Sequence, residues 1–456
     1  MVRLRRCIAF ILVLLPGLLA ALACGTPKHE PAAAAGAAGP SVDAALAGFI
    51  GRIRAVDNHT HVNSVDPGDS ESDALPLDAL APFDLPARVR PDNRVWVQAA
   101  KALYGYQYDD LSEAHLAELR AAVQRTAREQ GNQFPAWVLD RIGTETMLAN
   151  RIAMGPGLAP PRFVWVSYVD ALILPLSTRA EAAVTPERAK LYPLENKLLR
   201  RYLDDLHLTK VPATLDGYLG SVVTPTLERQ RQAGAVAIKF EAAYLRSLDF
   251  AEAAADRASR VYARFADGEE PPHADYKVLQ DFIFRYMARE AGRVGLAVHI
   301  HSFEGAGAYY EAAGADPLLL ESAFNDPALR GTTFVIIHGG GVFAPHAAAL
   351  LWKPNVYADI SLMTALYAPA QLAAVLRDWL LQYPEKVLFG TDAAAFGPDL
   401  GWPLAAWIAT TTGRQALALA LSEMMRNEEV TRARAEAIAT MVLRTTSAKL
   451  YKLPLK

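Results

Sequence analysis

The fold is decided between residues 235 and 392, where five short apolar runs read Val236-Ala-Ile-Lys239, Leu296-Ala-Val-His-Ile-His301, Thr333-Phe-Val-Ile-Ile-His338, Asn355-Val-Tyr-Ala-Asp-Ile360 and Lys386-Val-Leu-Phe-Gly-Thr-Asp392. Apolar runs of this length, separated by helical segments, are typical of buried strands, and their alternation predicts a parallel sheet. Residues 53–58, 142–153 and 162–174 predict three further strand regions. The whole pattern therefore predicts an α/β fold, a (β/α)8 TIM barrel with helical insertions, with a doubly wound sheet as the alternative.

Two segments are too long to be simple connections between strands and helices. One runs from Val62 to about Phe134 and is polar, then helical; the other runs from Thr178 to Gly234 and is mostly helical. We expect the first insertion to cover one end of the fold. Substrate identity would depend on both insertions and is not predicted by the sequence.

The N-terminus has the features of an export signal. Three arginines precede an apolar segment from Cys7 to Leu22, and Ala20-Ala-Leu-Ala-Cys24-Gly resembles a bacterial lipobox, with Ala21 where leucine is usual. We predict a lipoprotein-type signal peptide at residues 1–23, a flexible tether at 24–45 and the barrel domain at 46–456. The protein would be exported in a bacterium, as a membrane-anchored lipoprotein or in the periplasm; an ordinary cleaved signal or an uncleaved anchor is the alternative.

Composition limits the classes of protein that remain. Of the 456 residues, 52% are hydrophobic, which suffices for a large core. The only cysteines, Cys7 and Cys24, precede the barrel domain, so that domain can form neither a disulfide nor a cysteine-ligated zinc site. Removal of the presequence changes the formal charge from −3 to −6, and this mildly acidic balance argues against nucleic acid as a partner.

Polar residues that can bind metal end several of the predicted strands. In a (β/α)8 barrel the C-terminal strand ends converge on the active site. Two histidines separated by one residue in a strand point to the same side. Random placement of ten histidines would give roughly 0.2 His-x-His pairs, yet this chain has two. A single such histidine is as well explained by a structural role, but together the set predicts a metal site: His59, His61, Lys239, His301, His338 and Asp392.

This ordered set resembles the amidohydrolase superfamily, and most closely its amidohydrolase-2 branch. Supporting phrases are Ala237-Ile-Lys239 with Ala243-Tyr-Leu-Arg246, then Phe389-Gly-Thr-Asp392 and the segment from Met441 to Lys452, so the resemblance extends from about Gly51 to the C-terminus. It implies that His59, His61 and Asp392 bind one metal ion and that His301 and His338 bind a second. A carboxylated Lys239 would bridge the two ions, because a carbamate, unlike an ammonium, is an anionic oxygen ligand.

The resemblance implies a metal-dependent hydrolase that acts on a small molecule, in which a metal-activated water attacks an amide, ester or lactone bond and Asp392 transfers the proton. Two zinc ions are expected, although manganese, iron or nickel fit the same donors. A one-metal decarboxylase, hydratase or isomerase is the alternative enzyme; relatives of that kind commonly lack the bridging lysine. A non-catalytic surface-anchored binding protein is a further alternative. As substrate contacts we predict His299, Tyr244 and Arg246; His299 could instead support the metal ligands.

Overall fold

The structure is a computed structural model that describes residues 41–76, 80, 84–184, 186–304 and 310–454. The predicted signal peptide and most of the predicted tether lie outside these residues. Helix α1 (Ala44–Arg52) begins two residues before the predicted start of the barrel domain, because Asp43 caps it by accepting a hydrogen bond from the backbone N–H of Leu46. Leu46 and Ile50 bury the apolar face of this helix.

Eight parallel strands form one sheet in which each strand pairs with the next one in sequence. The first strand closes the ring against the segment after the last one, since the backbone N–H of His61 donates to Ala393 and that of Asp392 donates to His59. The predicted (β/α)8 barrel is thus confirmed, and the doubly wound alternative, whose strand order is not consecutive, is wrong. The strands are β1 (Ala55–Thr60), β2 (Thr144–Arg151), β3 (Phe163–Tyr168), β4 (Ala235–Phe240), β5 (Ala297–His301), β6 (Phe334–Ile337), β7 (Val356–Asp359) and β8 (Val387–Leu388).

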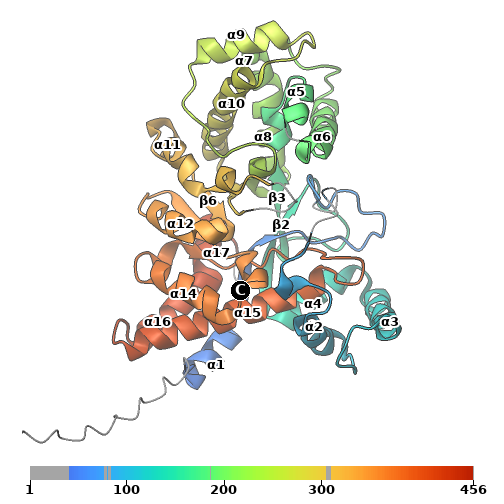
Figure 1. Ribbon diagram of the computed structural model, residues 1–456, viewed down its shortest axis with the longest axis vertical. Helices are drawn as coiled ribbons and strands as arrows, with labels where there is room; N and C mark the ends of the chain where they lie inside the picture. Colours follow the sequence, from blue (N-terminus) through green and yellow to red (C-terminus); the bar gives the residue numbers. More distant parts are fainter. Residues whose placement is uncertain (1–40, 77–79, 81–83, 185, 305–309, 455–456) are drawn as a thin grey trace, which may run out of the picture. The chain divides into compact units, whose positions relative to one another are not determined.

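The strands are buried on both faces, which explains why strands such as β4 and β6 are mostly apolar and do not alternate between apolar and polar residues. Strands lie at the centre and helices surround them (Figure 1). The helices are α2 (Arg94–Tyr104), α3 (Glu113–Gln130), α4 (Phe134–Ile142), α5 (Arg179–Val184), α6 (Tyr192–Asp205), α7 (Leu215–Tyr218), α8 (Thr224–Gln232), α9 (Ala255–Phe265), α10 (His273–Val294), α11 (Glu321–Phe324), α12 (Ala344–Leu350), α13 (Met363–Leu366), α14 (Pro369–Leu380), α15 (Trp402–Arg426), α16 (Arg432–Thr440) and α17 (Thr446–Tyr451).

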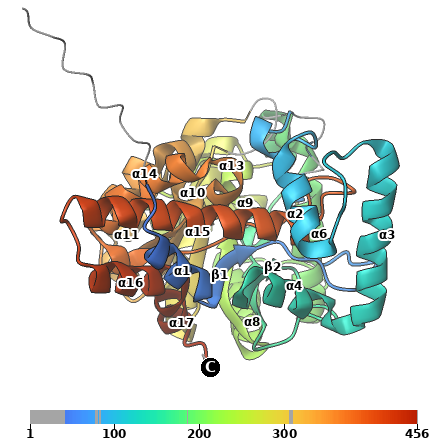
Figure 2. The same cartoon turned by 90° about the horizontal axis from the view of Figure 1, so that it is seen from below.

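The predicted insertion after the first strand contains α2 and α3, and α4 follows it. These three helices lie together beside the barrel, away from α14 and α16 (Figures 1 and 2). The long helix α15 packs against both α14 and α2. Buried side chains cover most of its length. In the part of the chain that the structure describes, no helix is both long and apolar enough to cross a membrane.

The third strand is shorter than the apolar sequence around it. Residues 162–174 suggested one continuous strand region, but β3 ends at Tyr168 and residues Asp170–Ile173 form a short 3-10 helix. A polar contact explains the turn, because the Asp170 carboxylate accepts a hydrogen bond from the backbone N–H of Glu241 at the end of β4. The chain therefore turns directly after β3, near the C-terminal strand ends where the metal site is predicted.

The C-terminal helix α17 contributes to the barrel interior. Its Tyr451 packs in a buried cluster with strand residues that include Val56, Leu148 and Ala237. The Tyr451 hydroxyl donates to Oδ1 of Asn58 at 2.5 Å and lies 2.7 Å from Nε2 of His299. One side chain thereby joins two strands that are far apart in sequence.

Candidate metal centre

The strand ends bring the six predicted ligands to one region of the barrel. His59 lies in β1 and His61 follows it, Lys239 lies in β4, and His301 ends β5. His338 follows β6 directly, and Asp392 follows β8 by four residues. The ring centroid of His338 lies 5.0 Å from that of His59 and 4.7 Å from that of His301.

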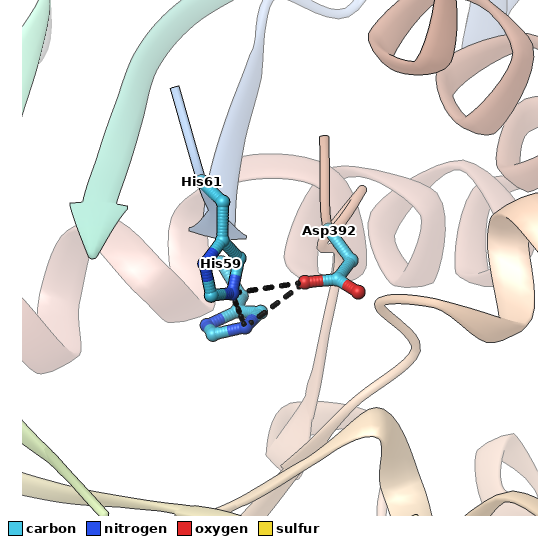
Figure 3. A group of neighbouring side chains, drawn as sticks. All are labelled: His59, His61 and Asp392. Atoms are coloured by element: carbon cyan, nitrogen blue, oxygen red, sulfur yellow. Dashed lines mark hydrogen bonds and ion pairs between the residues drawn. The ribbon is translucent and has the colours of Figure 1, made fainter. Parts of the chain in front are cut away.

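Three of these residues point ligand atoms at one another (Figure 3). Nε2 of His59 lies 3.2 Å from Nε2 of His61. Oδ1 of Asp392 lies 3.1 Å and 3.4 Å from these two nitrogens, yet accepts no hydrogen bond from the residues that the structure describes. Buried polar atoms normally have partners, so this arrangement of two imidazoles and a carboxylate fits a divalent cation.

Burial keeps most of the imidazoles neutral. Desolvation lowers the pKa of His59, His301 and His338 well below the usual value, and positive charge on Lys239 lowers each further. Nε2 of His301 is buried and has no hydrogen-bond partner among the described residues. Metals bind the neutral form of histidine, so these side chains are suited to act as ligands.

His61 differs from the other three histidines. Burial by itself lowers its pKa, but the carboxylates of Asp73 and Asp392 raise it to about 9. Without a cation the His61 imidazole is therefore positively charged at neutral pH, with a proton on each ring nitrogen. A cation that binds Nε2 must displace the proton on that nitrogen.

Partners of the Nδ1 atoms orient two of the imidazoles. The Ser361 hydroxyl donates to Asp359 and lies 2.8 Å from Nδ1 of His338, so its oxygen is placed to accept the Nδ1 proton. Oδ2 of Asp73 lies 3.1 Å from Nδ1 of His61. In both cases the partner can hold a proton on Nδ1, so Nε2 is the nitrogen left to bind a metal.

At His59 the contact has the opposite polarity. The amide nitrogen of Asn150 lies 2.8 Å from Nδ1 and donates to the Thr60 carbonyl, while Oδ1 of Asn150 is buried without a partner among the described residues. Metal binding at Nε2 of His59 requires the proton on Nδ1, and a 180° turn of the amide would let Oδ1 accept it. Metal binding at Nε2 of His59 would therefore favour the orientation of the Asn150 amide in which Oδ1 faces Nδ1.

Lys239 has a neighbour that the sequence did not lead us to predict. Its Nζ is fully buried and lies 3.4 Å from Nε2 of His59 and 3.4 Å from Oε1 of Glu241. Burial raises the pKa of Glu241 to about 7, against the opposing effect of Lys239. When ionised, Glu241 stabilises the ammonium form of Lys239, whereas carboxylation requires the neutral amine.

Backbone conformation at two predicted ligands is strained. His338 has φ 66° and Asp392 has φ 56°, a region that residues other than glycine adopt rarely. Such strain persists only where the surroundings enforce it, and it is concentrated at functional sites. After His338, Gly339 also has positive φ, and a Cβ there would lie 2.3 Å from the Trp379 ring and 2.8 Å from the Asp359 carbonyl oxygen.

Two buried aspartates, Asp57 and Asp359, fix the strand ends. Asp57 accepts hydrogen bonds from the backbone and the hydroxyl of Thr391, which joins β1 to the segment that carries Asp392. Asp359 accepts from the backbone N–H of His338 at 2.8 Å and from the Asn58 amide at 2.7 Å. The predicted ligands therefore rest on buried hydrogen bonds between strands.

The three predicted substrate contacts have different surroundings. The Tyr244 ring centroid lies 4.4 Å from that of His301, so Tyr244 adjoins the site. His299 is fully buried with its Nε2 beside the Tyr451 hydroxyl, which gives it a supporting position in the barrel interior. Arg246 directs hydrogen bonds to Gln280, Asp281 and two backbone carbonyls, so these contacts engage most of its donors within the protein.

Asp73 and Glu241 are the acidic residues near the site that the prediction lacked. Their ligand atoms and one of His61 all lie within 4.8 Å of one another. Glu241 follows Lys239 by two residues, and the period of a strand could have indicated it. Asp73 lies in the loop after β1, where no periodic pattern marks it.

Comparison with known proteins supports this description. A family model described as amidohydrolase matches residues 198–453, which include Lys239, His301, His338 and Asp392. A protein from Lactobacillus casei ATCC 334, described as a "putative metal-dependent hydrolase", is similar in structure, with TM-score 0.56 and 15% identity over 89% of this chain and 97% of its own. Glucuronate isomerase from Caulobacter crescentus has TM-score 0.54 and 15% identity over 90% of this chain and 94% of its own.

Uronate isomerase from Thermotoga maritima is similar too, with TM-score 0.50 and 12% identity over 89% of this chain and 96% of its own. No curated protein matches the chain significantly in sequence. At these identities the structural neighbours show the fold alone. The barrel and its strand-end histidines define a metal-dependent enzyme fold of the amidohydrolase superfamily. The chain belongs to the amidohydrolase family whose model covers more than half of its length.

Proposed function

We propose that this protein is a metal-dependent hydrolase that cleaves an amide, ester or lactone bond of a small molecule. The observation that carries the proposal is the convergence of His59, His61 and Asp392, whose three donor atoms lie 3.1–3.4 Å apart. These residues would hold one divalent ion, with zinc as the expected metal. His301, His338 and a carboxylated Lys239 would hold a second ion.

A divalent ion held there lowers the pKa of a bound water and polarises the bond to be broken. Asp392 would accept a proton from the attacking water on its carboxylate and donate it to the leaving group. Burial raises the pKa of this carboxyl above its usual value, which favours its holding a proton. The Tyr244 ring, which packs beside His301, would contact the substrate.

A single-metal isomerase, decarboxylase or hydratase is the second candidate, and the contact between Glu241 and Lys239 favours it. One cation and a lysine ammonium would balance the carboxylates of Asp73, Glu241 and Asp392. Two cations and a lysine carbamate would balance the same three carboxylates, so buried charge is compatible with both forms. The 3.4 Å contact supports the ammonium, and with it the single-metal form.

Metal content and turnover together test the two candidates. Metal per chain is measured with and without bicarbonate in the wild type, in Lys239→Ala, and in Lys101→Ala as a control at an exposed ion pair. Each protein is then assayed on amides, esters, lactones and sugar acids. Two metals and hydrolysis in the wild type, both reduced in Lys239→Ala alone, would support the hydrolase. One metal throughout, with isomerisation or decarboxylation, would refute it in favour of the second candidate.

The Asp392→Asn variant distinguishes a non-catalytic binding protein from the two enzyme candidates. A wild type that turns over none of the substrates, with ligand affinity preserved in the variant, would identify a binding protein.

We also propose export and attachment to a membrane through a lipid on Cys24. The support is the N-terminal sequence, which resembles a lipoprotein signal. Fractionation and labelling with radioactive palmitate test it in the wild type and Cys24→Ser. A wild type that is neither labelled nor associated with membranes would refute lipid attachment.

A further inference from the structure

We propose that Asp73, on the loop that follows β1, is a positioning residue that fixes the ring orientation of His61 and holds the proton on its Nδ1. The inference rests on the proposed metal centre and assigns it a residue outside the six predicted ligands. It also assigns a role in that centre to the long insertion between β1 and β2.

The contacts of Asp73 are specific. Oδ2 lies 3.1 Å from Nδ1 of His61, while Oδ1 accepts a hydrogen bond from the backbone N–H of Leu75. The carboxylate is therefore held from both sides. The hydroxyl of Tyr168, a fully buried residue at the end of β3, lies 3.0 Å from the same Nδ1.

The loop that carries Asp73 is fixed to the barrel by a buried ion pair. Arg151, fully buried at the end of β2, donates to Oδ1 of Asp69 at 2.6 Å and to the Val62 carbonyl at 2.7 Å. Oδ2 of Asp69 accepts from the backbone N–H of Ser64 at 2.7 Å. The loop is thus attached to the adjacent strand, so Asp73 is placed by the fold and not by chance contact of a surface side chain.

A carboxylate on Nδ1 has a known physical effect on a metal-binding imidazole. It selects the tautomer with a free Nε2, restrains the ring and makes Nε2 more basic, and loss of such a partner typically weakens metal affinity by about 10- to 100-fold. Nε2 of His61 points at Nε2 of His59 and at Asp392, where the metal is proposed (Figure 3). Asp73 would therefore act through His61 and not on the substrate.

A cation bound directly between His61, Asp73 and Glu241 is the competing interpretation, since these residues cluster within 4.8 Å. It would require His61 to give up the Nδ1 proton. It would also leave the remaining proton of His61 on Nε2, which points at Nε2 of His59 and at Asp392 and could then not bind the proposed metal. We therefore infer the positioning role.

Zn²⁺ titration of metal-free protein with a competing chelator tests the inference in the wild type, Asp73→Ala, Asp73→Asn and Asp66→Asn. Asp66 lies on the same loop, is exposed and accepts a hydrogen bond from the backbone N–H of Gly68, so its variant is the matched control. We expect Asp73→Ala to raise the Kd for Zn²⁺ about 10- to 100-fold and Asp66→Asn to leave it unchanged. Asp73→Asn should lie between, because its amide oxygen still accepts the Nδ1 proton without the charge.

A Kd in Asp73→Ala within twofold of the wild-type value overturns the proposal. A lower number of bound Zn²⁺ ions at unchanged Kd overturns it as well, because Asp73 would then be a ligand itself. Thermal unfolding of the metal-free protein shows whether Asp73→Ala folds. If it does not, the Kd of Asp73→Asn is used instead, and a value within twofold of the wild-type Kd overturns the proposal. A wild type that binds Zn²⁺ but hydrolyses nothing refutes the proposed function and leaves this inference standing, since affinity is the readout.

Discussion

Replacing Arg151 by methionine should destabilise the protein more than any single change at its surface. The guanidinium is fully buried and makes hydrogen bonds to Asp69, to the Val62 carbonyl and to the Ala153 carbonyl. Methionine fills similar space but leaves a buried carboxylate and two carbonyls without this donor. Removing one partner of a buried ion pair costs about 3–5 kcal/mol.

The structure places the expected loss at the lower end of that range. Asp69 still accepts hydrogen bonds from the backbone N–H groups of Ser64 and Glu71, which partly compensate its charge. We therefore expect about 3 kcal/mol of lost unfolding free energy in Arg151→Met. In the double variant Arg151→Met/Asp69→Asn the two losses of unfolding free energy should not add. The loss should be smaller than the sum of the two single-variant losses by a coupling energy of about 2 kcal/mol.

Urea unfolding followed by tryptophan fluorescence measures these energies, with Arg54→Met as the control. Arg54 pairs with Asp140 at 2.9 Å, but both side chains are about half exposed, so its loss should cost under about 1 kcal/mol. Equal losses for Arg151→Met and Arg54→Met, or a coupling energy near zero, would refute the reasoning that the loop is fixed by the buried pair.

Three further outcomes are expected. Asp392→Asn should unfold like the wild type but lower turnover by about 10²- to 10⁴-fold in a steady-state assay, and unchanged turnover would remove Asp392 from proton transfer. Burial alone would raise the pKa of Asp69, but hydrogen bonds, chiefly from Arg151, lower it to about 2. Since the folded-state pKa lies below the unfolded value, the ionised carboxylate contributes about 2 kcal/mol to the free energy of unfolding. This contribution is present above pH 4 and is lost as the pH falls through 2. Asp69→Asn should therefore approach wild-type stability in acid denaturation, and a gap that persists at pH 2 would contradict this. Gly339→Ala should lower the free energy of unfolding by about 3 kcal/mol, as measured in urea. Gly51→Ala is the control, because a Cβ there meets open space and should not lower it. Equal stability of the two variants would show that the loop after β6 shifts to accommodate the methyl group.

Much of the fold could be predicted because the strands are buried on both faces. In β4 and β6 the apolar run is short and continuous, and the polar residues Lys239 and His338 stand near or directly after its C-terminal end. The barrel then dictates that these ends meet. Strand β8 is the extreme case, with two residues, and the sequence still predicts it because they lie in the apolar run Val387-Leu-Phe389.

What could not be predicted depends on contacts between segments far apart in sequence. Asp73 reaches His61 because a loop is held by Arg151, 82 residues beyond Asp69, and no local pattern encodes that distance. The hydrogen bonds of Arg246 are a second example of contacts that no local pattern encodes. Its position after Lys239 suggested a substrate contact, but Asp281 and Gln280 from helix α10 take up its guanidinium.

The contact between Tyr451 and Asn58 has a consequence for the order in which the chain is made. The two residues are separated by 393 positions, and synthesis at about 5–20 residues per second places roughly 20–80 s between them. During that interval β1, which carries His59, has been synthesised, while the Tyr451 hydroxyl that donates to the Asn58 amide oxygen has not. A nascent barrel therefore lacks this hydrogen bond to Oδ1 of Asn58 until helix α17 has been synthesised, and only then can that helix support the first strand.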